Sequence, residues 1–230
     1  SVEYLILLGV FLAGLCLLLY PSVSNYWNSI TQSRAIVDYD TIVKSLSPKD
    51  YTAYFKRAEE YNSELKALPF PLTEYQQISG YDDCLNAAGD GVIGYIDIDK
   101  IQVKLPIYHG TDPSMLNHAC GHIQGSSFPI AGKGTHAAIS AHRGLPSAKL
   151  FSDLDKLEVG DTFRITVLDK TFIFGERMGA LYINVDGTVH FVLNKLFPQV
   201  EDLGVEITYY DDVEDGVEIL SRFVDKEKTM

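Results

Sequence analysis

The first pattern in the chain is an uncharged apolar run close to its start. Residues 4–20 read YLILLGVFLAGLCLLLY and carry no charged side chain. A run of this length lies at the short end of the roughly 17–25 residues that a helix needs to cross a bilayer. The tyrosines at both ends suit the aromatic belt at the membrane interface. We therefore predict a transmembrane anchor over residues 1–20, closed by Pro21, with residues 4–20 in contact with lipid.

Two alternatives compete with an anchor. A cleaved signal peptide has a shorter apolar core and a small-residue cleavage site, whereas no A-x-A sequence follows this run. A buried helix of a soluble protein has an apolar stripe rather than an apolar circumference, and residues 4–20 are apolar all round. The pattern favours the uncleaved anchor over both.

Helical patterns follow the anchor. Residues 30–46 place apolar side chains at helix-like intervals, with Ile36, Tyr39 and Val43 as examples. Ser47-Pro48-Lys49-Asp50 is a helix start, because serine caps, proline fits the first turn and an acid follows at the third position. We predict a helical stalk over residues 21–67. Residues 68–85 then form an irregular connector.

From residue 86 onward the pattern changes to alternating apolar and polar positions, which is typical of half-buried strands. Short strands separated by glycine, proline and aspartate turns favour a β-barrel or a sandwich over a parallel α/β sheet. Residues 181–185 and 188–192 flank Asp186-Gly187, the sequence of a two-residue hairpin turn. We expect a mainly β domain over residues 86–230, whose last part, from Val213, is a helical tail. The predicted strands cover residues 94–99, 101–107, 137–141, 162–168, 181–185, 188–192 and 205–209.

Composition narrows the function. The net charge is −12, which argues against nucleic-acid binding because that function needs a basic face. The three cysteines, Cys16, Cys84 and Cys120, form no CxxC pair and no metal-ligand spacing. A Cys84–Cys120 disulfide stays open, because its geometry cannot be derived from sequence. His136 and His142 are six apart but lack further ligands at metal-binding spacing, so we expect neither a metal nor another cofactor.

Three segments carry a resemblance to a known family. They are LLLYPSVSNYWN at 17–28, IDIDKIQVKLPIYHGT at 96–111 and GHIQGSSFPIAGKGTHAAISAHRGLPSAKLFSDLDKLEVGDTF at 121–163. Together they are similar to class C, pilin-polymerising, sortases. The third segment is the most specific, because it is long and contains the family's histidine. The resemblance covers residues 4 to about 172.

The resemblance implies a fold, an activity and a location. The fold would be a closed eight-stranded β-barrel with N-terminal helices and a membrane-spanning anchor helix. The activity would be that of a cysteine transpeptidase, which cleaves an LPXTG-like sorting signal and joins pilin subunits through a lysine amine. The location would be the membrane of a Gram-positive-type bacterium, with a single span and the catalytic-type domain outside. The partners would be pilins or other LPXTG-bearing surface proteins.

The family's catalytic set is a histidine, a cysteine and an arginine, and the histidine corresponds to His142. A thiolate attacks a carbonyl carbon, and a nearby imidazolium favours the thiolate. The histidine can then protonate the leaving amine. An arginine can hold the substrate and stabilise the oxyanion. Without the resemblance, His142 would be interpreted as a surface loop histidine.

The pattern stops where the other two catalytic residues are expected. No cysteine follows Cys120, and no TLxTC-like segment occurs. Arg164, Arg177 and Arg222 lie downstream but outside the family's arginine context. Residues 173–230 are compatible with a divergent C-terminal part, with an altered reading of the sequence, or with a change of nucleophile to Cys120. We predict that the chain does not cleave an LPXTG peptide. The alternative function is a non-catalytic, membrane-tethered module that binds pilins or sorting signals.

A lid is the second departure. Class C enzymes usually carry a loop with Asp-Pro followed by an aromatic residue. The corresponding connector here offers Leu68-Pro69-Phe70-Pro71, without an acid before the proline. Phe70 is therefore a candidate lid residue, and a proline-stiffened linker is the alternative. The one Asp-Pro pair, Asp112-Pro113, follows the first strands and is succeeded by Ser114.

Overall fold

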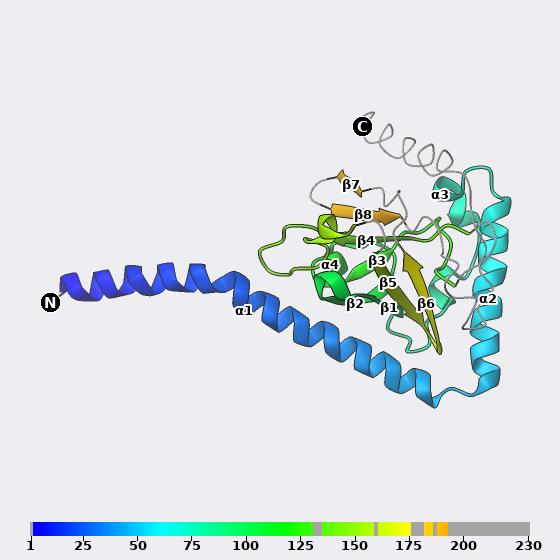
Figure 1. Cartoon of the computed structure of the whole chain (residues 1–230), viewed down its shortest axis with the longest axis horizontal. Coiled ribbons are helices and arrows are strands. Elements are labelled where there is room, and N and C mark those ends of the chain that lie inside the picture. Colours follow the sequence, from blue (N-terminus) through cyan, green and yellow to red (C-terminus); the bar gives the residue numbers. More distant parts are fainter. Residues whose placement is uncertain (1, 131–134, 159–160, 176–181, 186–187, 193–230) are drawn as a thin grey trace.

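The computed structural model describes residues 2–130, 135–158, 161–175, 182–185 and 188–192. Its longest element is α1, which runs without interruption over Val2–Ser45 and contains Pro21. Pro21 marks the end of the apolar run but not the end of the helix. An internal proline removes one backbone hydrogen bond and kinks a helix without always ending it, and Figure 1 shows a bend part-way along α1.

The second helix, α2 (Pro48–Ala67), turns back from the end of α1 and lies at the far end of the molecule from the N-terminus (Figure 1). The predicted start is confirmed. The Ser47 side chain accepts a hydrogen bond from Asp50 N, and the Asp50 carboxylate accepts one from Ser47 N at 2.8 Å. Short helices follow along the chain, namely α3 (Pro71–Glu74), the 3-10 helices η1 (Tyr75–Gln77), η2 (Tyr81–Asp83), η3 (Asp99–Ile101) and η4 (Leu154–Lys156), and α4 (Pro113–Leu116).

Among the described residues, eight strands form one mixed sheet in the order β6-β5-β1-β2-β3-β4-β8-β7. Each neighbouring pair is antiparallel except β2 and β3, which are parallel. The strands are β1 (Val92–Ile98), β2 (Val103–His109), β3 (Cys120–His122), β4 (Ala138–His142), β5 (Thr162–Val167), β6 (Lys170–Gly175), β7 (Tyr182–Val185) and β8 (Thr188–Val192).

The expected closed barrel is not formed by the described residues. The sheet is open, because β6 and β7 are its two end strands and do not pair with each other. Closure requires strand tilt and stagger to agree around the whole circuit, which alternation along single strands does not specify. The predicted hairpin at 181–192 is confirmed by the antiparallel pairing of Val185 with Thr188. The strand predicted at 205–209 and the helical tail lie outside the described residues.

The core joins the second half of α1 to the sheet. Tyr39 is fully buried, and its hydroxyl donates to the Ile93 carbonyl at 3.1 Å and accepts from Leu168 N at 2.8 Å. Burial raises the pKa of Tyr39, so the hydroxyl stays protonated and can donate. This one side chain therefore connects α1, β1 and the turn between β5 and β6.

A buried amide attaches α2 to the loop before β4. The Asn62 side chain donates to the Phe128 carbonyl at 3.2 Å and accepts from Phe128 N at 2.7 Å. Both bonds are buried, so they satisfy backbone groups that would otherwise lose water without compensation. The loop that leads into β4 is thereby fixed from the side of α2.

Candidate functional site

His142 is the last residue of β4, as the small-apolar pattern before it suggested. Its side chain is half-buried, and its carbonyl accepts a hydrogen bond from Phe151 N at 3.2 Å. In the sheet, β4 lies between β3 and β8, and His142 is opposite Thr188. The histidine therefore sits where a central strand gives way to a loop.

The loop after His142 is fixed by polar contacts. Arg143 forms an ion pair with Asp155 at 2.9 Å. Gly144 has a φ of +76°, a conformation that side chains with a Cβ rarely adopt, and its N–H donates to Ser152 Oγ at 2.9 Å. The direction in which the chain leaves His142 is thus set by Gly144 and by contacts within residues 143–155.

The same loop is attached to α1. Asn25 Oδ1 accepts from Lys149 N at 2.8 Å, and Asn28 Nδ2 donates to the Ser147 carbonyl at 2.8 Å. Lys149 also donates from Nζ to the Ile101 carbonyl at 2.7 Å and pairs with Asp153 at 3.0 Å. Sequence reasoning missed both asparagines. Their position just after the apolar run was the available signal, but nothing in the sequence identified the loop as their partner.

Cys120, the candidate substitute nucleophile, is on the strand next to His142 but faces away from it. Gly121 is opposite Ser140 in the β3–β4 pair, so Cys120 stands opposite Ala141. Because side chains alternate between faces, Cys120 shares the face of Ala141, and His142 shares that of Ser140. The Cys120 thiol is completely buried in the core, and burial raises its pKa well above the ordinary value. The structure does not bring these two groups together.

The other two thiols are also remote from this chemistry. Cys84 is buried, free of any disulfide, and burial raises its pKa to about 11. Its sulfur lies 3.3 Å from the Gly80 carbonyl. Cys16 is an exposed residue within the apolar run of α1. A catalytic thiol needs a lowered pKa, and burial pushes both core thiols in the opposite direction.

The connector that carries Phe70 packs near the start of β4. A Cβ on Gly125 would lie 2.7 Å from Leu72 Cα, and Tyr75 Oη donates to Gln124 Oε1 at 3.2 Å. Ser126 Oγ accepts from Ala138 N, the first residue of β4. His142 is at the other end of that strand, about 13 Å further on at the usual strand rise. Phe70 itself is 52% exposed. These contacts place the connector over the end of β4 opposite to His142.

Asp112, in the one Asp-Pro pair, has a structural role. It is the N-cap of α4 and its side chain accepts from Ser114 N at 2.8 Å. The hydroxyl and the N–H of Ser114 both donate to this carboxylate, and these hydrogen bonds lower the pKa of Asp112. Arg164, on β5, pairs with Asp97 and Asp99 on the outside of the sheet, while Arg177 and Arg222 lie outside the described residues. Within the described part of the chain, no group of three or more potential metal ligands occurs.

A buried aromatic network was also missed by sequence reasoning. The Tyr81 hydroxyl lies 2.9 Å from His122 Nδ1 and accepts from Gly110 N at 3.0 Å. His122 Nε2 lies 2.9 Å from the Ser127 carbonyl, so this nitrogen carries the proton. Complete burial lowers the pKa of His122 to about 4. The imidazole is therefore neutral, and it connects β3 to the loop before β4.

Comparison with known proteins relates this chain to a protein family. The sortase domain model matches residues 96–178, a range that begins within β1 and includes β2 to β6 and His142. Sortase C1 of Streptococcus agalactiae is 39% identical with a TM-score of 0.58, over 68% of this chain and 83% of that chain. Sortase C-1 of Streptococcus pneumoniae is 31% identical with a TM-score of 0.55, over 68% and 83%. Sortase C1 of GBS Pilus Island 1 is 28% identical with a TM-score of 0.57, over 79% and 80%. No curated protein matches.

The chain therefore belongs to the sortase family, and its resemblance to class C is confirmed. The match to sortase C1 of Streptococcus agalactiae covers 68% of this chain, which is more than the histidine segment alone. The family model stops at residue 178, close to the point where the sequence pattern stops.

Proposed function

We propose that this chain is a membrane-anchored, class C sortase-like protein that binds LPXTG-like sorting signals or pilin subunits near His142 without cleaving them. The observation that carries this proposal is the location of the three thiols. Two are buried in the core and the third is on α1, within the apolar run. Among the described residues, none lies on the face of the sheet that His142 occupies.

Transpeptidation by a sortase needs a thiolate that attacks the threonine carbonyl of the sorting signal. The histidine then protonates the leaving glycine amine, and a lysine amine of another pilin resolves the thioester. The half-buried location of His142 at the end of β4 supports its assignment to this proton transfer. Without a thiolate, this histidine can contribute to binding but not to acyl transfer.

The membrane anchor rests on α1. This helix is long and apolar enough to cross a bilayer, and its most apolar window has no buried residue. We assign residues 1–20 to the anchor, 21–67 to the helical stalk, 68–85 to the connector and 86–230 to the sortase-like domain. The streptococcal relatives support a Gram-positive-type cell surface, with one span and the domain outside.

Peptide turnover and peptide binding test the proposal separately. The full-length chain in detergent micelles is incubated with a fluorogenic LPXTG peptide and a lysine-analogue amine. We expect no cleavage, but saturable binding in a titration of the same peptide. A scrambled peptide is the matched control, and His142→Ala should weaken binding. No binding at high peptide concentration would contradict the proposal.

A second candidate is a transpeptidase that uses Cys120. The position of β3 next to β4, with Cys120 opposite Ala141, favours this thiol over the other two. Its use would require the sheet to open, because the thiol is in the core. Steady cleavage that disappears in Cys120→Ala but persists in Cys84→Ala would establish it. The absence of cleavage in the unmodified chain would exclude it.

A further inference from the structure

The loop that follows His142 lies beside the exit of α1 from its apolar run. Asn25 and Asn28 contact Lys149 and Ser147, respectively, at 2.8 Å. At 1.5 Å per residue, these asparagines are about 8 and 12 Å along the helix from Tyr20. The loop therefore contacts α1 within the first few turns after the apolar run.

The same turn of α1 exposes two large aromatic side chains. Tyr26 and Trp27 lie between the asparagines in sequence and are 67% and 70% exposed. Tyrosine and tryptophan prefer the headgroup level of a bilayer, because their rings are amphipathic. In this part of α1, Asn25 and Asn28 thus contact the loop, while Tyr26 and Trp27 remain exposed and available to the headgroup layer.

The charges on the loop and its neighbours are paired. Arg143 is bound to Asp155, and Asp153 binds both Lys149 and Lys156. Paired charges give the loop no strong preference for anionic lipid. The attraction to the surface comes instead from the apolar run and its aromatic flank. A zwitterionic bilayer is therefore the appropriate partner.

We propose that residues 144–149 form a membrane-surface contact, and that Asn25 and Asn28 are positioning residues that hold this loop at the level of lipid headgroups. This inference rests on the membrane anchor of the proposed function. It places the His142 end of β4 toward the bilayer and the connector end away from it.

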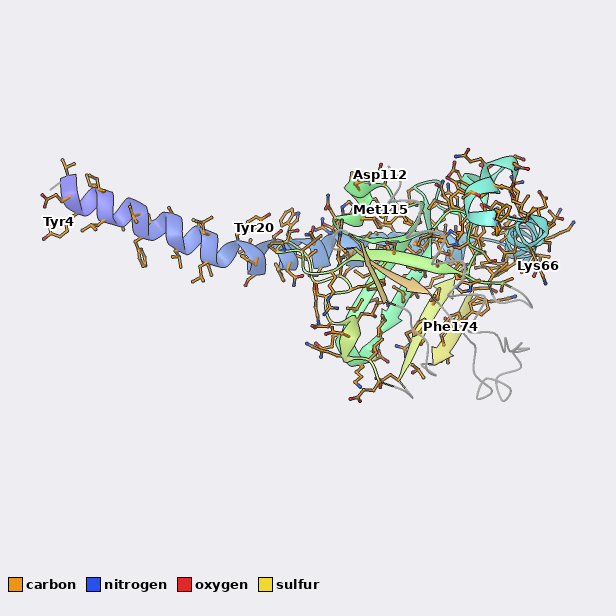
Figure 2. The ribbon with its side chains drawn as sticks, turned by 90° about the horizontal axis from the view of Figure 1, so that it is seen from above. Tyr4, Tyr20, Lys66, Asp112, Met115 and Phe174 are labelled. Atoms are coloured by element: carbon orange, nitrogen blue, oxygen red, sulfur yellow. The ribbon has the colours of Figure 1, made fainter. Side chains whose placement is uncertain are left out.

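Site-specific fluorescence tests this arrangement in the full-length chain. In a Cys16→Ala background, a fluorophore is attached at Ser147→Cys or at Lys66→Cys. Lys66 is at the far end of the molecule from Tyr4 (Figure 2), and Cys84 and Cys120 are buried and protected from labelling. The protein is reconstituted into phosphatidylcholine vesicles that contain a lipid with a quencher on its headgroup. We expect loss of fluorescence at residue 147 and none at residue 66.

The asparagines are tested in the same assay. In Asn25→Ala/Asn28→Ala, quenching at residue 147 should fall to the level seen at residue 66. Ser33→Ala is the matched control, since its hydroxyl donates to the Ser29 carbonyl within α1, and it should leave quenching unchanged. Circular dichroism shows whether each variant is folded, and single-asparagine variants replace the double variant if it is not.

Each outcome has a distinct meaning. No quenching at residue 147 in vesicle-bound protein would overturn the surface contact. Quenching that persists in the folded asparagine variants would overturn the positioning role. Failure of the unlabelled chain to remain with vesicles in flotation would instead overturn the anchor itself, which separates that failure from the failure of this inference.

Discussion

The two halves of α1 are parts of one helix in two different environments. From Val2 to Tyr20, large apolar side chains point outward on all sides and are exposed (Figure 2). From Ser29 to Ser45, three apolar residues, Ile36, Tyr39 and Val43, are buried, and most of the remaining side chains are polar. The difference shows that a continuous backbone can serve a membrane and a soluble core, because side-chain pattern and not secondary structure selects the surroundings.

The largest effect is expected from removing a ring in the second half. Tyr39→Ala should lower the free energy of unfolding by about 3–5 kcal/mol, since it leaves a cavity in the core. It also removes the bonds to Ile93 and Leu168. Tyr26→Ala, on the exposed face, should change it by less than about 0.5 kcal/mol. Chemical denaturation in micelles measures both. Equal losses would contradict the assignment of Tyr39 to the core and of Tyr26 to the exposed surface of α1.

A charge in the first half of α1 should weaken membrane insertion and leave the stability of the domain unchanged. Leu12→Arg should cost about 3–4 kcal/mol of membrane insertion, because arginine is unfavourable and leucine favourable at the centre of a span. The thermal unfolding temperature of the domain should not change, since Leu12 is exposed and distant from the core. Flotation with vesicles measures insertion. Undiminished flotation of the variant would show that residues 4–20 are not the span.

Acid should affect the domain and not the anchor. The folded pKa of His122 is about 4, below the ordinary 6.5, so the unfolded chain binds a proton first as the pH falls. The stability conferred by the neutral imidazole is complete above about pH 6.5 and decreases by about 3 kcal/mol toward pH 4. Burial lowers the pKa values of His109 and His136 in the same direction.

Unfolding titrations at pH 7, 6 and 5 measure this slope, and the slope should be smaller in His122→Gln. Residues 4–33 contain no acidic, basic or histidine side chain, so flotation should be constant over the same range. A flat stability profile would show that His122 is protonated in the folded state or that it becomes solvated.

The smallest effects distinguish two buried tyrosines. The Tyr39 hydroxyl has two backbone partners, whereas the Tyr61 hydroxyl is buried with none in the described structure. Tyr39→Phe should therefore cost about 1–3 kcal/mol, and Tyr61→Phe should be neutral or slightly stabilising. Denaturation midpoints compare the two directly. A larger loss for Tyr61→Phe would mean that its hydroxyl has a partner, such as bound water.

The sequence was informative wherever local pattern decides structure. The Ser47 cap, the apolar run and the pairing of β7 with β8 each depend on residues close to one another in the sequence. The attachment of α1 to a distant loop just after Pro21, through Asn25 and Asn28, was not predictable in this way.

The candidate site follows the same division. His142 was found through a long family motif. The face of Cys120 depends on the register between β3 and β4, which no local pattern encodes. Likewise, no local pattern shows whether the two end strands of the sheet, β6 and β7, pair with each other. The asparagine contacts join residues more than a hundred positions apart, so only the assembled fold shows them.

The bond from Leu168 to Tyr39 also has a consequence for the order of synthesis. These residues are separated by 129 positions. At translation rates of 5–20 residues per second, about 6–26 s pass between their appearance. During that time Ile36, Tyr39 and Val43 have already been synthesised, but part of the core that finally covers them has not. The apolar face of α1 is therefore exposed to aggregation at the membrane surface until β5 has been synthesised. We expect the exported nascent chain to need a chaperone most during this interval.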